Sequence, residues 1–295
     1  MPHTQNFLDD KHIRNIISLA IDEDLDQGDI TTELLIPEKL HGDALITAKG
    51  NGIIAGGEIA KMVFKKVSPS LEFKIFIEDG DRITPGDTIA NIFGSIKCIL
   101  KAERIALNFL QRLSGIATTT ARYVDEISNP RIKIMDTRKT TPGLRLLEKY
   151  AVYIGGGINH RFHLGESILI KDNHLTALRR LGLSLKDTVK KAKTQAGNGK
   201  TVEVEVGNRE EASEAVQGGA DVILLDNMTP DDIKSVLSVI PEHIITEVSG
   251  GITIDNIRSI AMPGVGRISI GALTHSVKAL DISLEIVPES IRPAD

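Results

Sequence analysis

The sequence predicts an α/β protein in which a parallel sheet forms a barrel and follows a smaller mixed α/β unit. After residue 131, six short apolar runs alternate with helical stretches, and repeated β-α units of this length indicate a parallel sheet. The runs cover residues 131–136, 167–171, 201–206, 221–226, 244–248 and 267–270. No Rossmann-type glycine fingerprint accompanies them, which favours a barrel over an open doubly wound sheet. Aromatic residues make up only 3% of the chain, so the core is aliphatic, as strands buried on both faces require.

The first hundred residues show a different pattern of expected helices and strands. Apolar periodicity predicts an early helix that ends near residue 21 and a second helix over 56–67, with strands over 42–49, 52–55, 71–77 and 88–93. A long helical pattern then runs from 97 to 127, and we expect Ser114 and Gly115 to kink or break it. We therefore expect a first domain over residues 1–115, joined by 275–295 packing back on it, and a barrel domain over 116–274.

Composition excludes several classes of protein. The 295-residue chain carries a net charge of -5, which argues against nucleic acid as the main partner. No apolar run approaches the length that spans a bilayer, and the first residues carry acids, so we expect neither a membrane segment nor a signal peptide. The single cysteine, Cys98, fits a reducing compartment, and we expect a cytoplasmic protein.

Cationic side chains gather at strand ends between residues 136 and 174. Arg138 and Lys139 follow the first barrel strand, His160 and Arg161 follow a run of three glycines, and Lys171 ends the next strand. In a TIM-like barrel, functional side chains lie at the carboxyl ends of the strands. In an acidic protein this cluster predicts a pocket for a small polyanion. His160 alone fits a general base, a ligand or a structural histidine, and its neighbours favour anion binding.

Carboxylates end the later strands. Glu203 and Glu205 are two apart on one strand, so both point to the same face, and Asp226 ends the next strand. They could simply neutralise the neighbouring cations. Alternatively, they could hold Mg²⁺ together with the phosphates of a substrate, because Mg²⁺ prefers one or two carboxylates plus phosphate oxygens.

Glycine turns follow the last two strands, at Ser249-Gly250-Gly251 and Ile270-Gly271-Ala272. Together they predict a phosphate site built from backbone N–H groups. Motifs for zinc proteases and serine hydrolases are absent from the sequence. Lysines at strand ends also suggest a Schiff-base aldolase, although such a lysine needs an apolar pocket.

The chain resembles the quinolinate phosphoribosyltransferase family, also called nicotinate-nucleotide pyrophosphorylases (carboxylating). The resemblance covers essentially the whole chain through these motifs in order: EDLDQGDITTELLIP, AERIALNFLQRLSGIAT, DTRKTTPGLRLLEKYAV, GGGINHR, ILIKDNH, VEVEV, LLDNM, SGGI and SIGALTHS. It implies an N-terminal α/β sandwich domain and an incomplete TIM-like α/β barrel. It also implies a homodimer, and it leaves open whether dimers assemble into hexamers. Expected substrates are quinolinate and 5-phosphoribosyl 1-pyrophosphate, with Mg²⁺ as cofactor.

The resemblance also implies roles for individual residues. Lys139, Lys171, Glu205 and Asp226 would be catalytic, and Glu205 and Asp226 would hold Mg²⁺. Arg104 would reach the quinolinate carboxylates of the neighbouring subunit. The full set expected to contact substrates is Arg104, Thr137, Arg138, Lys139, His160, Arg161, Lys171, Glu203, Glu205, Asp226, Ser249, Gly250, Gly251, Ile270, Gly271 and Ala272. The alternatives are a nicotinate phosphoribosyltransferase-like relative, the Schiff-base aldolase and a non-catalytic anion-binding barrel.

Overall fold

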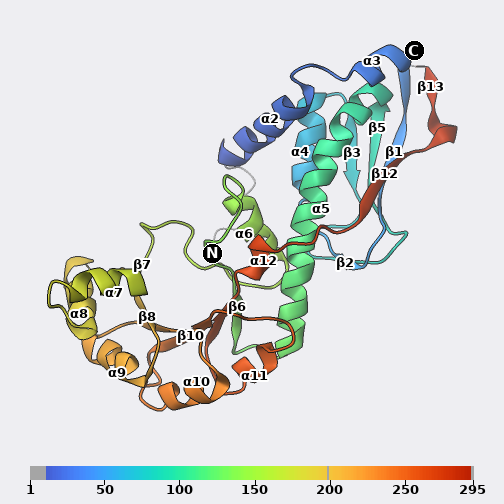
Figure 1. Cartoon of the computed structure of the whole chain (residues 1–295). Helices are drawn as coiled ribbons and strands as arrows, with labels where there is room; N and C mark the ends of the chain where they lie inside the picture. The colour runs from blue at the N-terminus through green and yellow to red at the C-terminus, as the bar shows by residue number, and fades with distance from the viewer. Residues whose placement is uncertain (1–10, 198, 294–295) are drawn as a thin grey trace. The chain divides into compact units, whose positions relative to one another are not determined.

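The computed structural model describes residues 11–197 and 199–293, which form two compact units (Figure 1). The first contains residues up to 121, then 141–156, then the chain from 276 onward, and the second contains 122–140 and 157–275. Residues 116–121 and 141–156, which the sequence places in the barrel domain, group with the first unit. The helix in 141–156 buries its apolar face in the first unit. This packing involves residues distant in sequence, so no local pattern indicates it.

The first unit is an antiparallel sheet with helices. The strands are β1 (Leu40–Ala48), β3 (Glu72–Ile75), β5 (Thr88–Ser95), β12 (Ile282–Ile286) and β13 (Arg292–Pro293), with the pair β2 (Gly52–Ile53) and β4 (Arg82–Ile83) apart. The helices are α2 (Lys11–Leu25), α3 (Ile30–Leu35), α4 (Gly57–Val67), α6 (Arg145–Ile154) and the 3-10 turn η1 (Pro288–Ser290). β12 pairs with β1, so the C-terminal segment completes this sheet.

Helix α5 (Ile96–Ile127) runs without the predicted break at Ser114 and Gly115. A Cβ on Gly115 would lie 2.3 Å from the carbonyl oxygen of Lys278. Ser114 donates its hydroxyl to Ala55 O and accepts the N–H of Ala55. Both residues therefore serve close packing against other segments of the first unit and leave the helix continuous.

The second unit is an open parallel barrel. Its six strands are β6 (Lys133–Met135), β7 (Ile168–Ile170), β8 (Val202–Val206), β9 (Val222–Asp226), β10 (Ile245–Ser249) and β11 (Arg267–Ser269), in the order β6-β11-β10-β9-β8-β7. The first strand pairs with the last, as in a closing barrel. Within the described chain, β6 and β7 are not paired. The predicted incomplete barrel is therefore confirmed, and its gap lies where the chain departs for α6.

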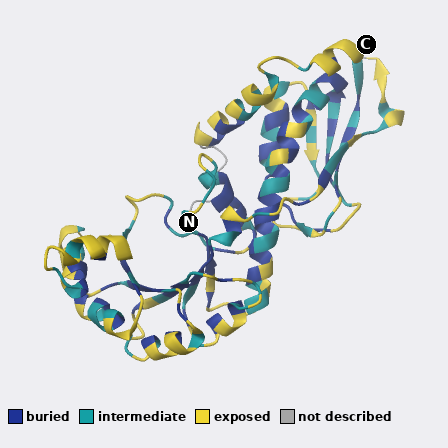
Figure 2. Ribbon diagram, in the orientation of Figure 1, coloured by how far each residue is buried: buried dark blue, intermediate teal, exposed yellow. Residues whose placement is uncertain are grey.

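Helices follow the strands of the barrel. They are α7 (Asp172–Arg179), α8 (Leu185–Gln195), α9 (Arg209–Gly218), α10 (Pro230–Leu237), α11 (Ile257–Ala261) and α12 (Ala272–His275). Strands such as β9 are buried along nearly their whole length, whereas the helices are buried on one face only (Figure 2). Side-chain caps at Ser184, Asn208 and Thr229 begin α8, α9 and α10. Tight strand-to-helix turns thus place polar side chains together at one end of the barrel. Among the described residues, no helix is long and apolar enough to cross a membrane.

Candidate active site

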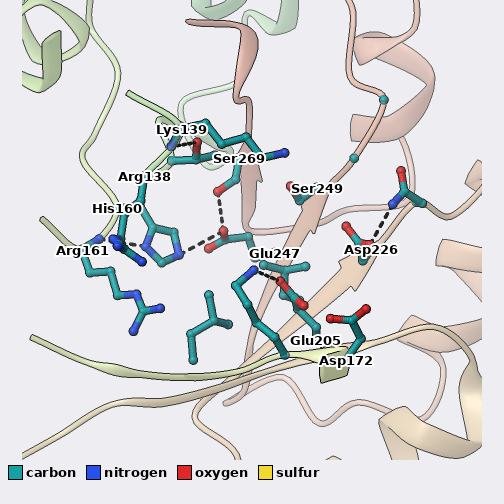
Figure 3. A pocket seen from close by; sticks show the side chains of 17 residues that line it. Arg138, Lys139, His160, Arg161, Asp172, Glu205, Asp226, Glu247, Ser249 and Ser269 are labelled. Carbon is teal, nitrogen blue, oxygen red and sulfur yellow. Dashed lines mark hydrogen bonds and ion pairs between the residues drawn. The ribbon is translucent and has the colours of Figure 1, made fainter. Parts of the chain in front are cut away.

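A pocket of about 600 Å³ lies at the carboxyl ends of the barrel strands (Figure 3). This volume falls in the range of small-molecule sites. The lining residues lie at the end of each strand or in the segments that follow: Thr137, Arg138, Lys139, His160, Arg161, Leu169, Lys171, Asp172, Glu205, Leu224, Asp226, Asn227, Glu247, Ser249, Gly250, Gly251 and Ser269. The structure therefore brings together the cations, the carboxylates and one of the two glycine turns that the sequence indicated.

Five predicted site residues lie outside this lining. Arg104 is exposed on α5 in the first unit. Glu203 is buried beneath the pocket, and Gly271 contacts the aliphatic part of Lys139. Ile270 is buried and its N–H donates to Met135 O at 2.9 Å. This N–H is therefore bonded within the sheet and does not face a phosphate, as the predicted 270–272 turn would need. Ala272 begins α12 beside it.

Two guanidinium groups form the cationic wall. Arg161 is only 9% exposed, and its Nη1 donates to Ser167 O at 2.7 Å. Burial lowers the pKa of Arg161, and the positive charge of Arg138 lowers it further. In the described part of the chain, the buried Nε atoms of Arg138 and Arg161 have no hydrogen-bond partner. Two neighbouring cations with unused donors at a pocket are stabilised by a bound anion.

His160 is a positioning group at the base of the pocket. Its Nδ1 accepts the backbone N–H of Arg161 at 2.8 Å, so the ring proton lies on Nε2. Nε2 lies 3.2 Å from Glu203 Oε2 and 3.5 Å from Glu247 Oε1. The His160 backbone N–H donates to buried Asp136 Oδ1 at 2.9 Å. The ring therefore ties the loop that carries Arg161 to the barrel interior.

Glu247 lies at the bottom of the pocket in a buried network. It accepts the hydroxyl of Ser269 and faces His160. Burial, reinforced by the charge of Glu203, raises the pKa of Glu247 to about 7. His160, Glu203 and Glu247 offer ligand atoms within 4.8 Å of one another. A metal would nevertheless need an Nε2 without a proton, so the hydrogen bond at Nδ1 disfavours a metal in this cluster.

Replacing Glu247 with glutamine should remove a pH-dependent loss of stability. The ordinary pKa is 4.5 and the folded value about 7, so the folded chain keeps a proton that the unfolded chain releases. The free energy of unfolding of the wild-type protein therefore falls by about 3 kcal/mol in total as pH rises from the unfolded pKa to the folded pKa. The difference in free energy of unfolding, Glu247→Gln minus wild type, should increase by this amount between about pH 4.5 and about pH 8 in urea titrations. Exposed Glu210→Gln is the control, and equal pH dependence of all three proteins would contradict the assignment.

The acidic wall faces the guanidinium groups. Glu205 Oε1 receives the Lys171 ammonium at 2.6 Å, the ion pair that simple neutralisation predicts. Asp226 ends the adjacent strand and accepts the Asn227 amide at 2.7 Å through Oδ2. Both carboxylates line the pocket and are partly exposed. Hard oxygen donors on neighbouring strand ends, open to a ligand that carries phosphates, fit the donor chemistry of Mg²⁺.

The turn after β10 depends on glycine. Gly250 and Gly251 have φ of 92° and 62°, a conformation that residues with a side chain rarely adopt. A Cβ on Gly250 would lie 2.2 Å from Asn227 Oδ1. Asn227 itself has φ of 54° and donates its N–H to Ser249 O at 2.9 Å. The ends of β9 and β10 are thereby locked together, with backbone groups of the turn facing the pocket.

The predicted set of substrate contacts omits six residues of the lining, namely Leu169, Asp172, Leu224, Asn227, Glu247 and Ser269. For two of the polar ones a signal existed, because Glu247 lies two residues before Ser249 on its strand and Ser269 ends the last strand at the same edge of the sheet. Leu169 and Leu224 carry no polar signal. They form an apolar part of the pocket that suits a flat ring.

Comparison with known proteins identifies the family. The family model described as the quinolinate phosphoribosyl transferase C-terminal domain matches residues 116–285, and that of the N-terminal domain matches 29–114. The chain belongs to the quinolinate phosphoribosyltransferase family. The "Probable nicotinate-nucleotide pyrophosphorylase [carboxylating]" of Bacillus subtilis is 45% identical over 90% of this chain and 90% of its own length. The mitochondrial "Quinolinate phosphoribosyltransferase [decarboxylating] 2" of Nicotiana glauca is 41% identical over 94% of this chain and 83% of its own.

A solved structure of the family agrees with the fold. "NadC from Streptococcus pyogenes" superposes with a TM-score of 0.89 at 39% identity, covering 96% of this chain and 97% of that one. The resemblance stated from the sequence motifs is thus confirmed, as is the predicted fold class. In this phosphoribosyltransferase, the strand-end pocket is the candidate active site.

Proposed function

We propose that this chain converts quinolinate and 5-phosphoribosyl 1-pyrophosphate to nicotinate mononucleotide, CO₂ and pyrophosphate, a step of de novo NAD biosynthesis. The relatives named above carry this activity in their names. The observation that carries the proposal is the pair Arg138 and Arg161, which are mutually repelling cations with unused buried donors at one side of the pocket. A planar dicarboxylate supplies the negative charges and acceptors that two guanidinium groups match.

The two substrates suit the two halves of the pocket. Quinolinate suits the cationic wall, with Leu169 and Leu224 beside its ring. The phosphoribosyl substrate suits the opposite wall, where Glu205 and Asp226 can hold ribose hydroxyls. Backbone groups of the 249–251 turn can bind its 5-phosphate. Lys139, exposed at the pocket edge, suits the pyrophosphate.

The proposed reaction needs no covalent enzyme intermediate. The pyridine nitrogen of quinolinate attacks C1 of the ribose while the C1–O bond to pyrophosphate breaks, through an oxocarbenium-like state. Lys139 and Lys171 stabilise the charge that develops on the leaving group, and Glu205 and Asp226 face the cationic ribose. The 2-carboxylate then leaves as CO₂, and the electron pair that remains on C2 takes up a proton.

Mg²⁺ is part of this proposal. Glu205 and Asp226 would hold it together with phosphate oxygens of the substrate, and it would supply charge neutralisation for the pyrophosphate. The donor set supports this choice, because both groups are carboxylates at adjacent strand ends and both line the pocket.

We further propose a homodimer in which Arg104 completes the dicarboxylate site of the neighbouring subunit. Lys171 is paired with Glu205, so fewer unpaired cations face quinolinate than the sequence suggested. Arg104 is exposed on α5 between residues that are otherwise largely buried, and it could supply a further guanidinium group. The single cysteine supports a cytoplasmic location.

A direct assay tests the proposed activity. The protein, quinolinate, phosphoribosyl pyrophosphate and Mg²⁺ are mixed, and CO₂ and nicotinate mononucleotide are followed. We expect both products in equal amounts and no reaction with EDTA present. Turnover of nicotinate in place of quinolinate would keep the reaction class and overturn the substrate. Trapping of Lys139 or Lys171 by borohydride with a carbonyl compound would instead support the aldolase, which the Lys171–Glu205 ion pair disfavours.

A further inference from the structure

The hydroxyl of Thr274 bonds to the backbone of the loop that carries Lys139. Thr274 lies in α12, after the last barrel strand, and its side chain is fully buried. Its Oγ1 donates to Lys139 O at 2.8 Å and lies 3.3 Å from Gly271 O. A hydroxyl has one proton, so the shorter contact to Lys139 is the stronger bond. This bond joins residues 135 positions apart and links the ends of the first and last strands.

Two further backbone bonds beside Lys139 are local. The N–H of Lys139 donates to Thr137 Oγ1 at 3.0 Å, and the N–H of Thr140 donates to Arg138 O at 2.9 Å. Such bonds shape the turn without fixing where it stands against the rest of the barrel. The Thr274 hydroxyl provides a fixed point on the neighbouring strand end.

Gly271 contacts the same lysine from the start of α12. A Cβ added there would lie 3.1 Å from Lys139 Cδ and 3.0 Å from the His275 ring. The absence of a side chain at this position leaves room for the aliphatic part of Lys139. The segment from Gly271 to Thr274 therefore contacts both the backbone and the side chain of one pocket lysine.

We propose that this segment positions Lys139 and that Thr274 is the positioning residue. By fixing the Lys139 carbonyl, the Thr274 hydroxyl holds the ammonium group at the place where pyrophosphate departs. The role rests on the proposed function, because it is the leaving group of that reaction which Lys139 would contact. Thr274 itself does not line the pocket and does not touch the reacting atoms.

Two substitutions at Thr274 distinguish the effect of losing the hydroxyl from the effect of losing packing volume. Thr274→Val keeps the side-chain volume and loses the donor, whereas Thr274→Ser keeps the donor and loses a methyl group. Thr188→Val is the matched control, since its hydroxyl also donates to a carbonyl, Ser184 O at 2.9 Å, in the same unit. We expect kcat to fall about 10-fold in the valine variant, with KM for quinolinate unchanged, and to stay near wild type in the other two.

Chemical modification of Lys139, which does not depend on turnover, also tests whether the Thr274 hydroxyl positions this lysine. Lys139 is exposed, so an acylating reagent modifies it and mass spectrometry gives the rate. Inorganic pyrophosphate with Mg²⁺ should protect Lys139, and half-protection should need about 10-fold more pyrophosphate in Thr274→Val only. If the valine variant fails to fold, Gly271→Ala should shift the same protection in the same direction, by about threefold.

Three results would overturn the positioning role. These are equal protection in valine and wild-type proteins, a serine variant as impaired as the valine variant, and no protection of Lys139 in the wild type. Failure of the proposed function is recognised separately. In that case the wild type makes no nicotinate mononucleotide, while the dependence of pyrophosphate protection on the Thr274 hydroxyl is still measured.

Discussion

Lys139→Ala should lower kcat of the phosphoribosyl transfer by about 1,000-fold, because the charge that stabilises the departing pyrophosphate is removed. Quinolinate affinity, measured by calorimetry, should stay within about threefold, since Arg138 and Arg161 remain. Lys139→Arg keeps the positive charge but places it on a guanidinium group, so its kcat should lie between those of Lys139→Ala and the wild type. The combination of lost kcat with retained dicarboxylate binding is the expected signature.

Lys133→Ala is the matched control for this experiment. Lys133 begins the same strand, is exposed, and donates its ammonium to Pro130 O at 2.7 Å, away from the pocket lining. It should behave as wild type. A Lys139→Ala protein that keeps more than about a third of wild-type kcat would remove Lys139 from the catalytic set.

The barrel could be predicted because each of its strands is a self-contained apolar run. The predicted runs 221–226 and 201–206 correspond to β9 and β8 within one residue. Where the prediction failed, long-range contacts decided the outcome. Gly115 resembles a helix breaker, yet a carbonyl of the C-terminal segment packs against it and the helix continues. The place of α6 in the first unit depends on packing that its local sequence does not reveal.

The candidate site was predictable where residue type and strand end are sufficient. Arg138, Arg161 and Glu205 stand in the pocket for that reason. The contacts of the His160 ring could not be predicted, since they involve one backbone N–H and two carboxylates from other strands. The close contact between the Asn227 side chain and Gly250 could not be predicted either, because it joins the ends of two different strands.

Mixing two inactive variants should restore activity if the site is shared between subunits. Arg104→Ala removes the exposed guanidinium of α5, and Lys139→Ala removes the pocket lysine. In a two-fold dimer, a heterodimer of these variants has one site with both residues intact and one with neither. Random exchange makes about half of the dimers heterodimers, so activity should reach about a quarter of wild type.

The recovered activity must follow subunit exchange. Subunits are exchanged by dilution and reconcentration, and differently tagged chains are co-purified to prove that heterodimers form. Lys133→Ala mixed with Lys139→Ala is the reference, because one member of that pair is active alone. If proven heterodimers of the Arg104 and Lys139 variants remain inactive, Arg104 acts within its own subunit or outside the site altogether. Activity near a quarter of wild type, with KM for quinolinate unchanged, is obtained only when an intact site draws Arg104 from one chain and Lys139 from the other.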